Sequence, residues 1–151
     1  MKYLYYDTPL PVTGSENAEA YAAFMQRAEE YDKQYQKIKG AFSKGFKEYY
    51  EKTGFHDASP VCFENLIGKN NTLRLTLSHQ GKLFEFTYKN VQHCRYEVFH
   101  KDTPQQWVLD YEILPAEDGC FSHEFSLAPD NGSILIVAKK TVFKRLPTMN
   151  R

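Results

Sequence analysis

The spacing of hydrophobic residues changes near Pro60. Before it, from residue 15 to residue 53, apolar side chains recur at alternating steps of three and four, which is the pattern of one helix face. After it, from residue 61 to residue 145, apolar and polar residues alternate, as they do in strands with one buried face. The pattern predicts an N-terminal helical region followed by a β region.

The helical stripe consists of apolar residues separated by a charged outer face, namely Tyr21, Phe24, Ala28, Tyr31, Tyr35, Ile38, Phe42 and Tyr49. Thr13 with Glu16 forms a capping-box pattern, Ser15 is a competing N-cap, and the helix is expected to begin at about residue 15. An unbroken helix to Lys52 would be about 57 Å long, too long for a compact domain of this size. Gly40 and Gly45 favour a break between residues 40 and 45 and two helices, with one continuous helix as the alternative.

Seven strands are predicted beyond Pro60, at residues 61–67, 72–78, 83–91, 93–99, 107–114, 120–127 and 133–145. Short links between them favour antiparallel neighbours. ILIV (134–137) is apolar on both faces and is expected near the centre of the sheet. KYLYY (2–6) predicts a further short strand. We expect a single α+β domain over residues 1–151, with one or two N-terminal helices on an antiparallel sheet of about six or seven strands.

Composition narrows the classes of function. Nineteen basic and nineteen acidic residues give zero formal charge, which disfavours nucleic acid as a partner. Cys62, Cys94 and Cys120 are an odd number without a CxxC pair, which is typical of a reducing compartment. We find no secretory signal pattern and no apolar stretch near the roughly 20 residues that span a bilayer. A cytoplasmic protein without membrane association is the expectation.

His56 and Asp57 form the most enzyme-like pair in the chain, because a neighbouring histidine and aspartate can begin a metal site. Gly54 and Phe55 precede them in a pattern typical of a helix C-terminus, where a left-handed glycine is followed by an apolar contact. A small metal-dependent hydrolase would need His56 and Asp57 to converge with Glu112, His123 or Glu124 in one cleft. The structural interpretation, a helix end, is the favoured one.

Zinc is a second candidate chemistry, because the β region contains soft ligands at His93, Cys94, His100, Cys120 and His123. The adjacent His93 and Cys94 point to opposite faces of a regular strand, as do Cys120 and His123 three residues apart. A bulge could realign them. Neither a metal nor another cofactor is therefore predicted.

Aromatic residues are abundant, with eleven Tyr, eleven Phe and one Trp, and Tyr and Trp are favoured anchors of protein interfaces. Tyr49, Tyr50, Tyr96 and Trp107 are the candidate binding residues, with partly buried core aromatics as the alternative.

Several segments together resemble those of a family of small uncharacterised bacterial proteins, a domain of unknown function with a helical N-terminus and a β C-terminus: FHDA (55–58), TYKNV (87–91), WVLDYEI (107–113), HEFSL (123–127) and TVFKR (141–145). The resemblance covers most of residues 15–145 and implies a shared fold without implying an activity. YLYYDTPLPV, near the N-terminus, departs from it.

These patterns favour a non-catalytic protein that binds a protein partner or forms a homo-oligomer. A toxin-neutralising immunity protein is one form of this function. The alternatives are the small hydrolase described above and a domain that binds a small ligand between helix and sheet.

Overall fold

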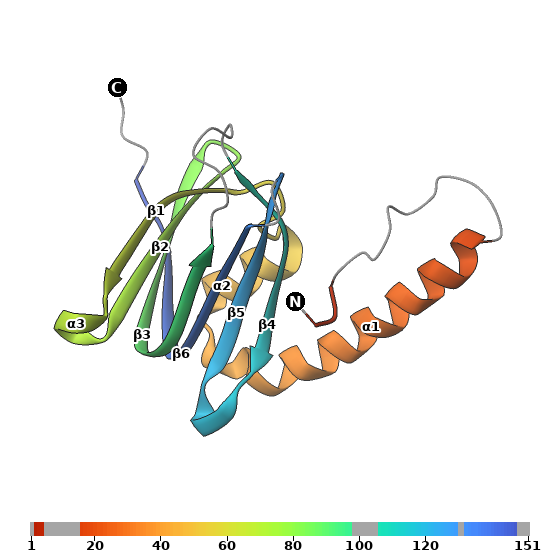
Figure 1. Cartoon of the computed structure of the whole chain (residues 1–151), viewed down its shortest axis with the longest axis horizontal. Helices are drawn as coiled ribbons and strands as arrows, with labels where there is room; N and C mark the ends of the chain where they lie inside the picture. Colours follow the sequence, from red (N-terminus) through yellow and green to blue (C-terminus); the bar gives the residue numbers. More distant parts are fainter. Residues whose placement is uncertain (1, 5–15, 98–105, 130–131, 148–151) are drawn as a thin grey trace.

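The computed structural model describes residues 2–4, 16–97, 106–129 and 132–147. Figure 1 shows a curved sheet with a short helix against it and a long helix extending away from it. In chain order the elements are α1 (Glu16–Ile38), η1 (Lys39–Ala41), α2 (Lys44–Lys52), β1 (Ser59–Leu66), α3 (Ile67–Asn70), β2 (Thr72–His79), β3 (Lys82–Glu97), β4 (Trp107–Pro115), η2 (Glu117–Gly119), β5 (Phe121–Ala128) and β6 (Gly132–Arg145).

The strands form one six-stranded antiparallel sheet in the order β1-β2-β3-β6-β5-β4, which confirms the predicted α+β class. β6 lies between β3 and β5, so the central position expected for residues 134–137 is confirmed. The prediction of separate strands at residues 83–91 and 93–99 is wrong. β3 is one strand with a register shift between Val91 and His93, next to Asn90 at φ 53°. The residues at this irregularity are of the types found in turns, which is why the sequence predicted two strands.

The two outer strands of this order approach each other at one end. The Asp57 amide donates to the carbonyl oxygen of Val108 at 2.8 Å, and the Val108 amide donates to the carbonyl oxygen of Ala58 at 2.7 Å. These bonds join the segment that leads into β1 to the start of the edge strand β4. The sheet therefore curls, and the segment from residue 54 to residue 58 is held beside β4.

The helical region breaks into two helices at Gly40, as predicted, whereas Gly45 lies inside α2. α1 ends at Ile38, a 3₁₀ turn containing Gly40 follows, and Ser43 caps α2 by accepting a hydrogen bond from the Phe46 amide at 3.2 Å. The expected helix starts at Thr13 and Ser15 lie outside the described residues. The strand predicted for residues 2–6 is wrong over residues 2–4, of which the last two form bends, and residues 5 and 6 lie outside the described part.

The core is an aromatic cluster between α2 and the sheet. Phe46, Phe55 and Phe86 are at most 1% exposed, and their rings meet Phe143 at centroid distances of 5.0–5.8 Å. His123 lies in the same layer, with its ring 5.4 Å from that of Phe86. The alternation of β2, β3, β5 and β6 supplies this apolar face, because every second residue of each strand points toward α2.

The two parts of α1 lie in different surroundings. Tyr31 and Tyr35 are 8% and 3% exposed, and α1 packs there on β4. The preceding part of α1, residues 16–28, extends away from the sheet in Figure 1 and is called the α1 arm below. On it, Tyr21 and Met25 are 56% and 40% exposed. None of the helices in the described ranges has the length and apolarity of a membrane-spanning segment.

Candidate functional site

Glu112 on β4 anchors the N-terminal segment, residues 2–4. Its carboxylate accepts hydrogen bonds from three consecutive backbone amides: Lys2 at 2.7 Å, Tyr3 at 2.6 Å, and Leu4. Glu112 is 1% exposed, and a buried carboxylate is tolerated only when hydrogen bonds replace its lost hydration. The N-terminal segment is therefore held against β4 by a side chain far away in the sequence.

Tyr31 connects α1 to the edge of the sheet. Its hydroxyl accepts a hydrogen bond from the Ile113 amide of β4 at 3.1 Å and is hydrogen-bonded to the hydroxyl of Tyr50 on α2. Burial raises the pKa of Tyr31 to about 12, so the phenol stays neutral at physiological pH. The three elements α1, α2 and β4 thus meet around two fixed phenols.

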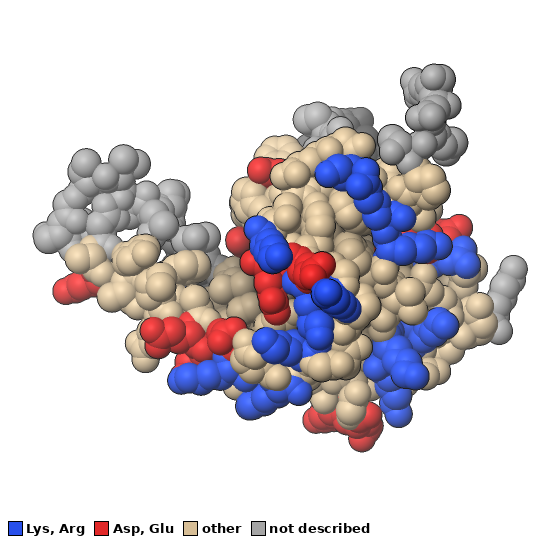
Figure 2. Space-filling model, turned by 180° about the vertical axis from the view of Figure 1, so that it is seen from behind, with Lys and Arg blue, Asp and Glu red and all other residues tan. Residues whose placement is uncertain are grey.

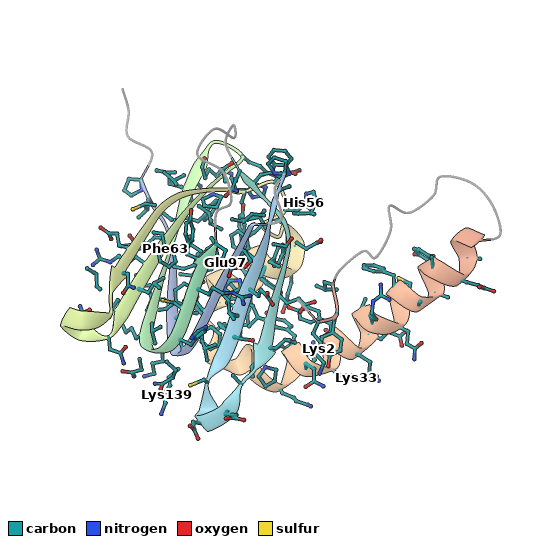
Figure 3. The ribbon with its side chains drawn as sticks, viewed as in Figure 1. Lys2, Lys33, His56, Phe63, Glu97 and Lys139 are labelled. Atoms are coloured by element: carbon teal, nitrogen blue, oxygen red, sulfur yellow. The ribbon has the colours of Figure 1, made fainter. Side chains whose placement is uncertain are left out.

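Beside these contacts lies a pocket of about 280 Å³. Its lining comes from the N-terminal segment, α1, α2, the segment after α2, and β4, and consists of Leu4, Phe24, Tyr31, Tyr50, His56, Leu109, Asp110 and Tyr111. Figure 3 shows His56 near the start of β4 and Lys2 farther along it, beside α1. The pocket combines aromatic walls with one imidazole and one carboxylate.

Asp110 is the ionisable group of this pocket whose charge is most affected by its surroundings. Burial raises the pKa of its carboxyl from 3.8 to about 6; His56 lowers it and the neighbouring Glu112 raises it further. At neutral pH the carboxyl is therefore mostly ionised, and it becomes neutral as the pH falls through about 6. A partly desolvated carboxylate of this kind favours a cationic ligand.

His56 and Asp57 occupy a helix ending, as the sequence indicated. Gly54 has φ 73°, and its amide donates to the carbonyl oxygen of Tyr49 at 2.8 Å. A β-carbon at residue 54 would also lie 2.1 Å from the Tyr111 hydroxyl oxygen, so only glycine fits. The His56 Nδ1 lies 3.1 Å from Asp57 Oδ1, and both side chains are exposed.

The other residues of the predicted hydrolase do not converge with His56. His123 is 1% exposed in the aromatic cluster, where its Nδ1 lies 2.8 Å from the Tyr88 hydroxyl oxygen. Glu124 lies beside Glu112 on the next strand, with Arg95 Nη2 at 3.9 Å. Of the five hydrolase candidates, His56 is the one that lines the pocket.

The zinc candidates are also dispersed. His93 is exposed and Cys94 half-buried, while Cys120 and His123 are buried; His100 lies outside the described residues. Within the described ranges, no three His, Cys, Asp or Glu residues are gathered as a metal site would require. Burial lowers the pKa of His123 to about 3, so its imidazole stays neutral within the core.

The four predicted binding aromatics are in unlike surroundings. Tyr50 is 9% exposed and lines the pocket. Tyr49 is half-buried, and its hydroxyl oxygen lies 2.5 Å from His79 Nδ1. Tyr96, 44% exposed, packs on Phe63, and Trp107 is 36% exposed. Phe24 on the α1 arm also lines the pocket and was not among the four predicted residues.

Sequence reasoning missed Asp110, Leu109 and Leu4. The signal for the first two is an irregularity in WVLDYEI, where the register shifts between Val108 and Asp110. An acidic residue between apolar ones at such a bulge is a candidate for a functional position. Leu4 had no such signal, because its position depends on the hydrogen bonds that residues 2–4 donate to the distant Glu112.

Comparison with known proteins adds no assignment: no protein-family model matches the chain, and no curated protein matches it. The resemblance described above therefore stays a prediction, and a function has to be inferred from the geometry.

Proposed function

We propose that this is a non-catalytic protein that binds a protein partner through the α1 arm and the adjoining pocket. The observation that carries this proposal is the exposed apolar stripe of the arm, which leads into the pocket. Tyr21 and Met25 are exposed, and Phe24 beside them lines the pocket. Side chains three and four residues apart share a helix face, so these three form one surface.

The opposite wall of the pocket continues this surface. Leu109 on β4 is 42% exposed and lines the same pocket as Phe24. Adjacent exposed apolar side chains on two elements are typical of interaction sites, and an amphipathic helix commonly supplies them at helical spacing. This arrangement supports a partner that lies along the arm and inserts a side chain beside Leu109.

Charge indicates the chemistry of that partner. The arm carries two acidic residues and one basic residue, a net charge of −1, and residues 29–32 directly after it add three more acidic residues, although the whole chain is neutral. Figure 2 shows acidic side chains on α1, mainly where it joins the body, and several basic side chains on the body. Electrostatic complementarity favours association with an oppositely charged surface. We therefore expect a partner segment that combines basic and apolar residues.

The proposal is tested by removing the stripe without changing the charge. Full-length chain is used to capture partners from native cells, and each captured protein is purified and titrated by calorimetry. For a Tyr21→Ala, Met25→Ala double variant we expect affinity to fall at least about tenfold, as loss of interface anchors does. The matched control is Gln36→Ala, a neutral and exposed position in the later part of the same helix, which should bind like the wild type.

Two outcomes would change the conclusion. A captured protein that binds the double variant as tightly as the wild type would exclude the arm as its docking surface. Concentration-dependent self-association that the double variant loses would instead make a second copy of this chain the occupant. Sedimentation of the wild type and both variants separates these cases.

A further inference from the structure

We infer that the pocket between the N-terminal segment, α1 and β4 is a receptor for an ammonium or guanidinium group. The inference rests on the proposed function in one respect: it takes a lysine or arginine of the partner as the source of that group. The pocket itself requires only its aromatic walls and Asp110.

The aromatic walls provide one half of cation recognition. Phe24, Tyr31, Tyr50 and Tyr111 all line the pocket, and the rings of Tyr50 and Tyr111 meet edge to face at 5.2 Å. The faces of aromatic rings carry partial negative charge and attract organic cations, most strongly where water is partly excluded. The bonds of Tyr31 to Tyr50 and to Ile113 hold the two phenols in place, so the walls exist before a ligand arrives.

Asp110 provides the other half. It lines the pocket and is half-buried, whereas the nearby Glu112 is already committed to three backbone amides of the N-terminal segment. A carboxylate in such a setting forms a charge-assisted hydrogen bond with an entering N–H donor. The same carboxylate would repel an anion, so the pocket discriminates between charges.

The size of the pocket limits the ligand. A volume of about 280 Å³ lies just below the roughly 300–1,000 Å³ usual for small-molecule sites. One basic side chain is therefore a better match than a large cofactor. Leu4, Phe24 and Leu109 can pack on the aliphatic stem of lysine or arginine while its charged end meets Asp110.

The charged groups around Asp110 define its pH response. His56 faces it from the segment after α2 and Glu112 from β4, while α1 and α2 contribute the neutral phenols of Tyr31 and Tyr50. Arg27 of α1 donates its Nε–H to the carbonyl oxygen of Tyr3 at 3.3 Å. Because the pKa of Asp110 is about 6, cation binding should weaken as the pH falls from 7.5 to 5.

The test uses three probes of equal chain length on the full chain: n-butylammonium, n-butylguanidinium and the neutral n-butanol. Backbone amide shifts are followed by NMR at pH 7.5. We expect both cations to give saturable shifts at residues 109–111 and n-butanol to bind at least about tenfold more weakly. The Asp110→Asn variant should bind both cations at least about tenfold more weakly, because the substitution removes the carboxylate that pairs with them. The matched control Asp118→Asn, at an exposed position in η2, should bind like the wild type.

The inference is overturned if n-butanol binds as well as the cations or if Asp110→Asn binds them unchanged. If that variant does not fold, the wild type at pH 7.5 and pH 5 gives the same decision, and unchanged affinity for the cations overturns the inference. Failure of the proposed function looks different: the cations still bind, but the Tyr21→Ala, Met25→Ala variant retains its partner. If the partner binds with unchanged affinity in the presence of saturating n-butylammonium, it docks without using the pocket. The cation that the pocket binds would then not be a lysine or arginine of that partner.

Discussion

The aromatic rings beneath α2 and those beside the α1 arm belong to the same residue types but are packed differently. Phe46, Phe55 and Phe86 are enclosed on all sides by other rings and are at most 1% exposed. Phe24 and Tyr111 line a pocket that is open to a ligand. The aromatic side chains are thus divided between an enclosed core under α2 and the lining of a pocket at the edge of the sheet.

The largest expected effect comes from opening the closed region. Phe46→Ala should lower the free energy of unfolding by about 3–5 kcal/mol, because it leaves a cavity among at least five rings. Tyr21→Ala, on the exposed arm, should change it by no more than about 0.5 kcal/mol. Urea denaturation of both variants measures the difference. Equal losses would mean that the arm is packed as tightly as the core.

Glu112 tests how firmly the N-terminal segment closes the open region. Glu112→Gln should lower the free energy of unfolding by about 2–3 kcal/mol, because hydrogen bonds to a charged, buried acceptor are lost or weakened. Its neighbour across the strands, Glu124→Gln, should cost less than about 1 kcal/mol, since its ion pair with Arg95 is partly exposed. Urea denaturation and amide hydrogen exchange at residues 2–4 measure the two effects. A stable Glu112→Gln variant with protected amides would contradict this role.

The buried imidazole of His123 should make the free energy of unfolding depend on pH. Its pKa is about 3 in the folded chain and 6.5 in the unfolded chain, so only the unfolded chain binds the proton between these values. Its contribution to stability is therefore complete above pH 6.5 and declines as the pH falls, by at most about 1.4 kcal/mol per unit. Comparison with His123→Gln isolates it: the difference in unfolding free energy between wild type and variant should shrink by about 2–3 kcal/mol from pH 6.5 to pH 4.5. A constant difference would mean that the imidazole is not desolvated.

The ionisation of Asp110 changes the free energy of unfolding with pH in the opposite direction to that of His123, and this change is the smallest one expected. The pKa of Asp110 is about 6 in the folded chain, above the ordinary 3.8, so the ionised carboxylate destabilises the fold above pH 6 and this cost vanishes as the pH falls toward 4. Asp110→Asn should thus raise the free energy of unfolding at pH 8 by less than about 1 kcal/mol, the half-exposed position allowing solvent screening. The gain should be absent at pH 4. A variant less stable than the wild type at pH 8 would mean that Asp110 has a partner in the fold.

Much of the fold was predictable because it depends on local periodicity. The alternation of Leu73, Leu75 and Leu77 correctly indicated a strand with one buried face, and all three are fully buried. Gly40 correctly marked the helix break. The division of β3 failed for the same local reason, since a bulge with Asn90 at positive φ has the sequence character of a turn.

The candidate site was predictable only in part. His56 was identified from its chemistry and does line the pocket, yet its sequence neighbour Asp57 does not. Glu112 was suggested as a catalytic carboxylate and instead binds backbone amides. The carboxylate that lines the pocket with His56 is Asp110, which comes from an edge strand more than fifty residues away, and no spacing rule connects the two.

The sequence alone determined where helices and strands form and which face of each is apolar, because those properties depend on residues a few positions apart. The tertiary structure decided the rest. The curl of the sheet brings residues 54–58 to β4, the carboxylate of Glu112 holds residues 2–4 there, and Tyr21 and Met25 of the α1 arm stay exposed. Pockets form where distant elements meet, so their composition depends on long-range packing that local periodicity does not encode.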